Sequence, residues 1–163
     1  MRFKSIPPAP DSLTFLEEAS QAVPLVPEPE ESCCVRLASR LEPVNKDEAR
    51  TWLAFLRALD LAEEGKLGYV RTGMPIEVAV LAEAFVARVF GVREVLSHLE
   101  EAGPADVDQI FELVRSIVPN WERHRNPGTW ESTWRDRTEA LLDWAVLFGL
   151  VTEADGSFDV DRS

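Results

Sequence analysis

The 163-residue chain contains little lysine, histidine and cysteine. Only three of its 17 basic residues are lysines, and its two histidines are His98 and His124. Its two cysteines, Cys33 and Cys34, are adjacent, a spacing that rarely permits a mutual disulfide, and no second pair could complete a zinc site. These absences exclude a disulfide scaffold and a zinc ribbon. We interpret the two cysteines as small buried apolar residues.

Long hydrophobic runs and catalytic motifs are also missing. No apolar run has the length of a membrane span, and the N-terminal residues 1–12 do not have the hydrophobic stretch of a signal peptide. HExxH, GxSxG and the glycine-rich phosphate and dinucleotide motifs are absent. We therefore expect a cytoplasmic, non-enzymatic protein without a membrane partner, a cofactor or a metal.

The acidic residues are in large excess. There are 29 of them, and the formal net charge is -12. Such acidity with scarce lysine is typical of proteins from salt-accumulating halophiles; the alternative is an ordinary acidic protein. A negative surface normally opposes nucleic-acid binding. In a halophile this argument is weaker, because molar salt screens charges over about 3 Å.

One pattern occurs twice, in residues 45–72 and 130–160. Each copy predicts an amphipathic helix, an apolar-to-polar step and a tight hairpin with a glycine turn. Asn45 and Thr129 are the predicted helix caps. The two apolar faces consist of Ala49, Trp52, Leu53, Phe55, Leu56 and Leu59, and of Trp134, Leu141, Trp144, Ala145 and Phe148. Two helices joined by a short turn and followed by a hairpin are typical of a winged helix.

Periodicity predicts further helices at 11–23, 30–41, 76–90, 92–102 and 106–118, with Pro43 ending the second of them. The predicted fold is mostly α, with tandem winged-helix-like modules, two short β-hairpin wings and a buried central helix. We expect an extended segment at 1–10, modules at 11–73 and 104–163, and apolar central helices at 74–103. The helix at 76–90 either joins the modules or forms a dimer interface through Val80, Phe85 and Val89.

Residues 121–137 differ from the rest of the chain in charge, because they have a net charge of about +1. We expect a loop over 120–134 and then the N-terminal part of a recognition helix, where arginines suit DNA phosphates and guanine edges. The predicted nucleic-acid-binding residues are Arg123, His124, Arg125, Asn126, Arg135 and Arg137. The interleaved Trp121, Trp130 and Trp134 equally suit a protein interface or a structural loop held by Arg–Trp stacking.

The corresponding helix of the first module is a poorer match for DNA. Lys46, Arg50 and Arg57 are offset there by Asp47 and Glu48. Its two apolar faces predict that the other module or a partner covers it.

The strings RLASRLEPVNKDEARTWLAFLRALDLAEE…GYVRT and EALLDWAVLFGLVTEADGSFDV resemble the helix-to-wing step of archaeal, haloarchaeal-type winged helix-turn-helix regulators. The second string matches this step at Leu142, Phe148, Gly149, Leu150, Val151, Glu153, Gly156 and Phe158. The first string matches it at Leu56, Leu59, Leu61, Tyr69 and Val70, with Asp60 where the family usually has glycine. The resemblance implies DNA binding or a scaffold role, since winged helices serve both.

Two hypotheses follow. The first is a DNA-binding winged-helix regulator of a halophile that binds double-stranded DNA and dimerises through residues 76–90. The second is a protein–protein interaction module, built on winged helices that do not bind DNA. In the second hypothesis the tryptophans are buried and the arginines face carboxylates of their own chain.

Overall fold

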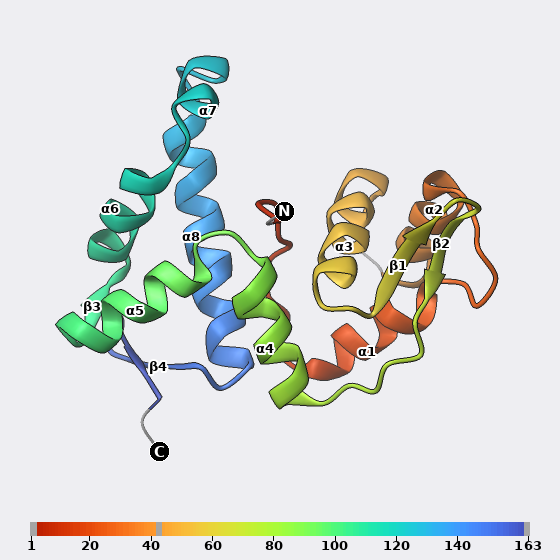
Figure 1. The fold of residues 1–163 in the computed structure, drawn as a ribbon, viewed down its shortest axis with the longest axis horizontal. Coiled ribbons are helices and arrows are strands. Elements are labelled where there is room, and N and C mark those ends of the chain that lie inside the picture. Colours follow the sequence, from red (N-terminus) through yellow and green to blue (C-terminus); the bar gives the residue numbers. More distant parts are fainter. Residues whose placement is uncertain (1–2, 42–43, 162–163) are drawn as a thin grey trace. The chain divides into compact units, whose positions relative to one another are not determined.

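Unit 1, residues 1–89, has three helices followed by a β-hairpin and a fourth helix (Figure 1). A computed structural model describes residues 3–41 and 44–161, which form two compact units; unit 2 spans residues 90–163. The elements of unit 1 are α1 (Leu13–Ala22), α2 (Glu30–Arg40), α3 (Lys46–Ala58), β1 (Ala62–Gly65), β2 (Gly68–Arg71) and α4 (Val78–Arg88). The predicted stop at Pro43 lies outside the described residues.

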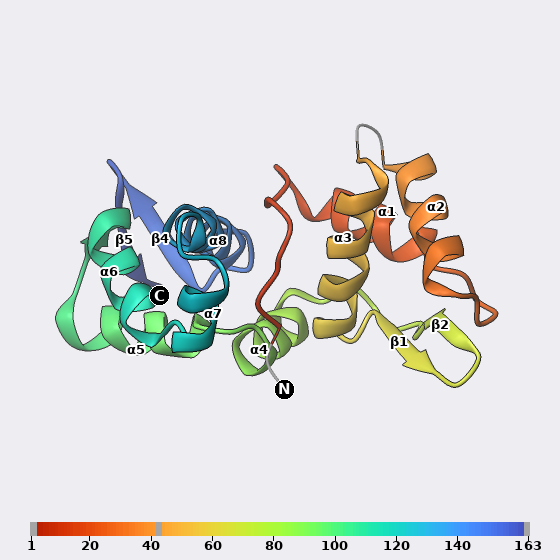
Figure 2. The same cartoon turned by 90° about the horizontal axis from the view of Figure 1, so that it is seen from above.

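The core of unit 1 lies between its helices, of which α1, α2 and α3 stand side by side above the hairpin (Figure 2). Phe55 of α3 is completely buried and meets Phe85 of α4 edge-to-face, with 6.3 Å between ring centroids. On the opposite side Trp52 contacts Phe15 of α1 at 5.2 Å. The two apolar faces of α3 are therefore covered by α1 and α4 of the same unit. The expectation that another module or a partner covers them is wrong.

Helix α4 is only partly buried. Leu81, Ala82 and Phe85 face the core, whereas Val78 and Val80 are exposed. Its apolar sequence thus serves one packed face and one face in solvent.

Unit 2 repeats the three helices and hairpin of unit 1 with an extra short helix and an extra short strand, and no helix follows its hairpin in the described residues. Its elements are α5 (Val92–Ala102), β3 (Ala105–Asp106), α6 (Val107–Ile117), α7 (Asn120–Arg125), α8 (Trp130–Leu147), β4 (Val151–Ala154) and β5 (Ser157–Val160). The sheet has the order β3-β5-β4, so the last strand is central. Trp144 of α8 is completely buried and stacks on Phe148 at 5.5 Å.

In both units the chain passes from a helix to the hairpin, or wing, through the same kind of junction. The helix is α3 in unit 1 and α8 in unit 2, and we call it the recognition helix after its position in a winged helix. In unit 1 the backbone turns at Asp60 (φ 63°), and Leu61 N–H donates to the Leu56 carbonyl. In unit 2 it turns at Gly149 (φ 75°), and Leu150 N–H donates to the Ala145 carbonyl. A left-handed residue here ends the helix and starts the hairpin.

The wings also share their strand register. Tyr69 pairs with Glu64 and bridges to Glu28, while Phe158 pairs with Glu153 and with Ala105 of β3. In each unit the segment before the second helix therefore lies against the inner strand of the wing. These pairings define which residues of the two units correspond.

Two local predictions are wrong. The predicted loop at 120–134 contains helix α7. Helix α8 begins at Trp130, directly after the predicted cap residue Thr129, whose side chain makes no capping hydrogen bond. Strands are not confined to the hairpins, since β3 is a third strand of the unit 2 sheet. The predicted cap at Asn45 is confirmed, because its side chain accepts the Glu48 N–H at 2.9 Å. Within the described residues, no helix is long and apolar enough to cross a membrane.

Candidate interaction surface of unit 2

Residues 121–137 lie on α7, the following turn and the first half of α8. Pro119 ends α6 and precedes α7, and the Asn126 carbonyl then accepts the N–H groups of Thr129 and Trp130 to start α8. Between α6 and α8 the chain inserts residues 118–129, whereas residues 41–45 join the corresponding helices of unit 1. The insertion places α7 next to the N-terminal end of the recognition helix.

The three tryptophans of this segment have different surroundings. Trp134 is 2% exposed, packs on Phe90 with 5.3 Å between ring centroids, and donates its indole N–H to Glu122. Trp130 is half-buried. Trp121 is 52% exposed. Of the three predicted interface tryptophans, only Trp121 presents most of its surface to solvent.

Two of the predicted arginines stack on these rings. The Arg123 guanidinium lies 4.7 Å from the centre of the Trp130 ring and donates to the carbonyl of Arg115. Arg137 lies 4.7 Å from the centre of the Trp134 ring, and burial lowers the pKa of its guanidinium. Both cations are thus held by their own unit.

A third arginine, Arg135, is held by carboxylates. It contacts Asp108 of α6 at 2.6 Å and Glu139 one turn along α8 at 3.6 Å. Its hydrogen bond to Asp108 raises the pKa of the Arg135 guanidinium, and the guanidinium also covers the Phe111 ring at 5.6 Å. This side chain joins α6 to α8.

The other predicted residues, His124, Arg125 and Asn126, are exposed at the end of α7. Among the described residues, Arg125 and His124 have no ion-pair partner within 4 Å. The six predicted nucleic-acid-binding residues thus divide into two sets. Arg123, Arg135 and Arg137 contact groups of their own unit, whereas the other three are exposed. The exposed set occupies the turn directly before α8.

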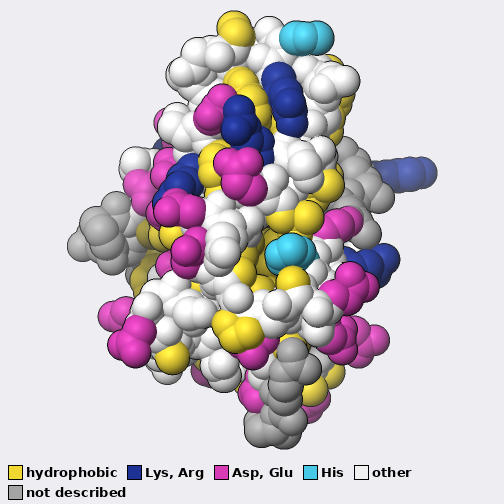
Figure 3. Space-filling view, turned by 90° about the vertical axis from the view of Figure 1, so that its left-hand side faces the viewer, with side chains coloured by type: hydrophobic (Ala, Val, Ile, Leu, Met, Phe, Trp, Pro, Cys, Tyr) yellow, Lys and Arg dark blue, Asp and Glu magenta, His cyan; other side chains and the backbone are white. Residues whose placement is uncertain are grey.

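Carboxylates surround this region. Figure 3 shows Lys and Arg side chains gathered at one end of the viewed face, with Asp and Glu side chains beside them. Residues 151–161, which contain the wing, have four acidic residues and no basic one. At Asp143 of α8, burial and then the charges of Glu153 and Glu139 raise the carboxyl pKa. The winged surface of unit 2 is therefore predominantly negative.

The basic residues of the unit 1 recognition helix are similarly occupied. Lys46 contacts Glu31 at 2.9 Å, and Arg50 contacts Glu30 at 3.1 Å. Arg57 contacts Glu64 of the wing at 3.4 Å. The carboxylates of α2 and of the wing thus offset the positive charge of α3.

The predicted interface residues of the central helix also differ in exposure. Phe85 and Val89 are buried in unit 1, and Val89 forms a β-bridge with Phe3. Val80 is 39% exposed. Only Val80 is therefore accessible to a second molecule.

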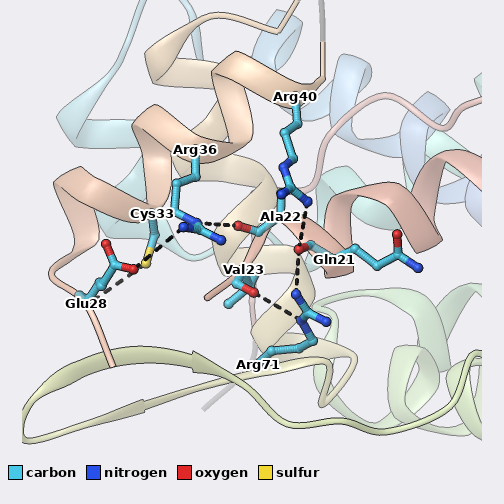
Figure 4. A network of polar contacts seen from close by, with 8 residues as sticks. All are labelled: Gln21, Ala22, Val23, Glu28, Cys33, Arg36, Arg40 and Arg71. Carbon is cyan, nitrogen blue, oxygen red and sulfur yellow. Dashed lines mark hydrogen bonds and ion pairs between the residues drawn. The ribbon is translucent and has the colours of Figure 1, made fainter. Parts of the chain in front are cut away.

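The structure gathers three further arginines that the sequence analysis did not single out. Arg36 and Arg40 of α2 and Arg71 of β2 converge on the C-terminal end of α1 (Figure 4). The four-residue spacing of Arg36 and Arg40 places them on one helix face. Nothing in the sequence, however, indicates that the wing supplies the third arginine.

Comparison with known proteins identifies the architecture. The family model described as "Halobacterial double winged helix domain" matches residues 1–163. No curated protein and no solved structure matches the chain. The match confirms both the predicted haloarchaeal winged-helix resemblance and the predicted double winged-helix fold.

Proposed function

This chain belongs to the halobacterial double winged helix domain family, and from that premise we propose that it is a non-enzymatic protein-interaction module. In this proposal the exposed surface around α7 binds another protein, and neither winged helix binds duplex DNA. The observation that carries the proposal is the intramolecular engagement of Arg123, Arg135 and Arg137.

The charge of unit 2 opposes DNA binding. It has seven basic and fifteen acidic residues, a net charge of -8, against ten and fourteen in unit 1, a net charge of -4. A wing approaches the DNA backbone, and this wing would bring carboxylates and no basic side chain to the phosphates. Molar salt weakens that repulsion, but it weakens the attraction of arginine for phosphate as well. High salt therefore does not restore affinity for DNA.

Releasing the bound arginines would also cost free energy. Each cation–π contact contributes about 0.5–2 kcal/mol. The Arg135–Asp108 ion pair adds little to this cost, because solvent and salt screen an exposed pair. Contacts with DNA would have to exceed these losses before they added affinity.

Helix α7 supplies a surface suited to a protein partner. Trp121 and Arg125 are both exposed and lie four residues apart, so they share one face of the helix. Tryptophan and arginine are the residue types most enriched at the energetic centres of protein interfaces. We therefore assign the partner contact to this pair.

Affinity purification from halophilic cells, performed with cross-linking and quantitative mass spectrometry, tests the proposal. We expect replacement of Trp121 and Arg125 by alanine to deplete a defined partner about tenfold. A matched control is Leu67→Ala, which changes an exposed apolar residue of unit 1 and should leave the partner in place. Equal recovery with wild type and the double variant contradicts the proposal. Light scattering of the pure protein identifies the case in which the partner is a second copy.

The second candidate is a DNA-binding regulator. It is favoured by the exposure of His124, Arg125 and Asn126 directly before α8, where a winged helix presents its recognition helix to the major groove. Fluorescence anisotropy of labelled duplex DNA over a range of KCl concentrations tests it. Saturable binding that weakens with salt, is lost in Arg125→Ala and persists in Arg93→Ala would replace the interaction proposal.

A further inference from the structure

Three guanidinium groups meet at the C-terminal end of α1. Arg40 and Arg71 both donate to the carbonyl oxygen of Gln21, at 3.2 and 2.6 Å (Figure 4). Arg71 also donates to the Val23 carbonyl at 3.1 Å, and Arg36 donates to the Ala22 carbonyl at 3.0 Å. Because Arg40 and Arg71 share one acceptor atom, their charges are held close together.

The positive charge of this cluster is poorly balanced. Glu28 contacts Arg36 at 3.8 Å, and neither Arg40 nor Arg71 has a carboxylate within 4 Å among the described residues. The carbonyl groups of a helix end contribute only about half a negative charge. Elsewhere in unit 1, Arg50, Arg57 and Arg88 each contact a carboxylate. The cluster at the end of α1 therefore has a local excess of positive charge, although the chain as a whole has a net charge of -12.

The winged-helix fold itself does not require these arginines. The register of the two units places Leu113, Ile117 and Val160 of unit 2 at the positions of Arg36, Arg40 and Arg71. Those apolar residues accompany the same helix and the same wing strand. The arginines of unit 1 therefore add a charged feature to a scaffold that forms without it.

The N–H groups of Arg40 and Arg71 that make no hydrogen bond within the described residues indicate which kind of ligand would fit. In the described part of the chain, most N–H groups of Arg40 and Arg71 have no acceptor, and Arg40 is exposed. Paired guanidinium groups match a tetrahedral oxyanion, whose oxygens accept charge-assisted hydrogen bonds from both. We propose that Arg40 and Arg71, supported by Arg36, form a binding site for a dianionic phosphate group. This site is independent of the α7 surface.

Titration of the full chain with inorganic phosphate tests the site. The arginine Nε–H signals are followed by NMR in KCl, at constant ionic strength and at a pH where phosphate is a dianion. We expect saturable shifts at Arg40 and Arg71. Arg40→Gln should weaken phosphate binding about tenfold, because it removes a charge-assisted pair of donors. Non-saturable shifts spread over all arginines would overturn the proposal.

Arg50→Gln is the matched control, since Arg50 is also an exposed arginine of unit 1 but contacts Glu30 and Asp47. It should leave phosphate affinity unchanged, and an equal loss in both variants contradicts the site. If circular dichroism shows that Arg40→Gln does not fold, Arg40→Lys decides. Lysine keeps the charge but not the planar pair of donors, so weaker binding supports the site and unaltered binding overturns it.

Discussion

The two units have the same backbone plan and different surface chemistry. Both turn from recognition helix to wing through a left-handed residue, and both place an aromatic ring at the centre of the wing, Tyr69 in unit 1 and Phe158 in unit 2. Yet the three arginines at the end of α1 in unit 1 correspond to apolar residues in unit 2. Unit 2 also has an inserted helix, α7. The comparison indicates that helix ends, turns and buried rings specify the fold. The exposed positions are free to differ between the two units.

The largest expected effect tests the shared core. Phe55 and Trp144 occupy corresponding positions, and both are completely buried. Replacing either by alanine should cost about 3–5 kcal/mol of unfolding free energy, because each leaves a large cavity. Hydrogen exchange followed by mass spectrometry should locate the lost protection in unit 1 for Phe55→Ala and in unit 2 for Trp144→Ala. The exposed Val146→Ala is the control, and a loss as small as that of the control would break the comparison.

The next effect distinguishes the wings. Gly68 has φ 123°, and a Cβ atom there would overlap the carbonyl group of Glu28. The corresponding residue of unit 2 is Ser157, which already has a side chain. We expect Gly68→Ala to destabilise unit 1 by about 2–3 kcal/mol through strain and overlap. Urea unfolding should show at most about 0.5 kcal/mol for Ser157→Ala. Similar losses of unfolding free energy in Gly68→Ala and Ser157→Ala would contradict the proposed difference between the two wings.

A smaller effect concerns the turn before each wing. Asp60 adopts the left-handed conformation that Gly149 adopts in unit 2. Gly149→Ala should cost about 1 kcal/mol, since a Cβ atom is unfavourable in this conformation. Asp60→Gly removes the same strain but also an exposed ion pair with Arg88, so its net effect should be close to zero. Thermal unfolding of both variants compares them, and a large loss in Asp60→Gly would show that the ion pair dominates.

The smallest effect near neutral pH is a difference in alkaline sensitivity. Burial, with the nearby Glu28 charge, raises the pKa of the Cys33 thiol to about 11. Burial and a hydrogen bond with Glu64 raise the pKa of the Tyr69 phenol to about 12. Both groups lose protons more readily in the unfolded chain, so unit 1 should lose stability as the pH rises above about 8.5.

The residues of unit 2 that correspond to Cys33 and Tyr69 are Ile110 and Phe158, which do not titrate. Urea midpoints measured for each unit between pH 7 and pH 10.5 should therefore fall in unit 1 only. Cys33→Val combined with Tyr69→Phe should reduce the pH dependence of unit 1, and the remaining dependence is expected from Cys34, because burial raises the pKa of its thiol as well. An unchanged slope in that double variant would show that other groups control it.

Sequence patterns were sufficient to predict the two helix-and-wing segments, because their information is local. The apolar period of α3 and α8, the Asn45 cap and the glycine turns all act within a few residues. Helix α7 was missed because its six residues are too few for an apolar period and the turn sequence Asn126, Pro127, Gly128 follows them. Strand β3 was missed because its two residues are defined only by pairing with the distant β5.

The candidate binding residues were harder to predict, because their environment is tertiary. Nothing adjacent to Arg135 in the sequence indicates Asp108 as its main partner, and Trp121 and Trp134 look alike in the sequence although one is exposed and the other buried. The basic segment could be located from its charge. The exposure of each of its arginines, however, depends on tertiary packing and could not be predicted from the sequence.

The strand order β3-β5-β4 has a consequence for folding during synthesis on the ribosome. The inner strand of the unit 2 sheet is the last one translated, so β3 and β4 have no common partner until residue 160 has emerged. Unit 1 has its complete hairpin once residue 71 is out. The first winged helix can therefore close as soon as α4 has followed this hairpin, while the second remains open until β5 is inserted between β3 and β4.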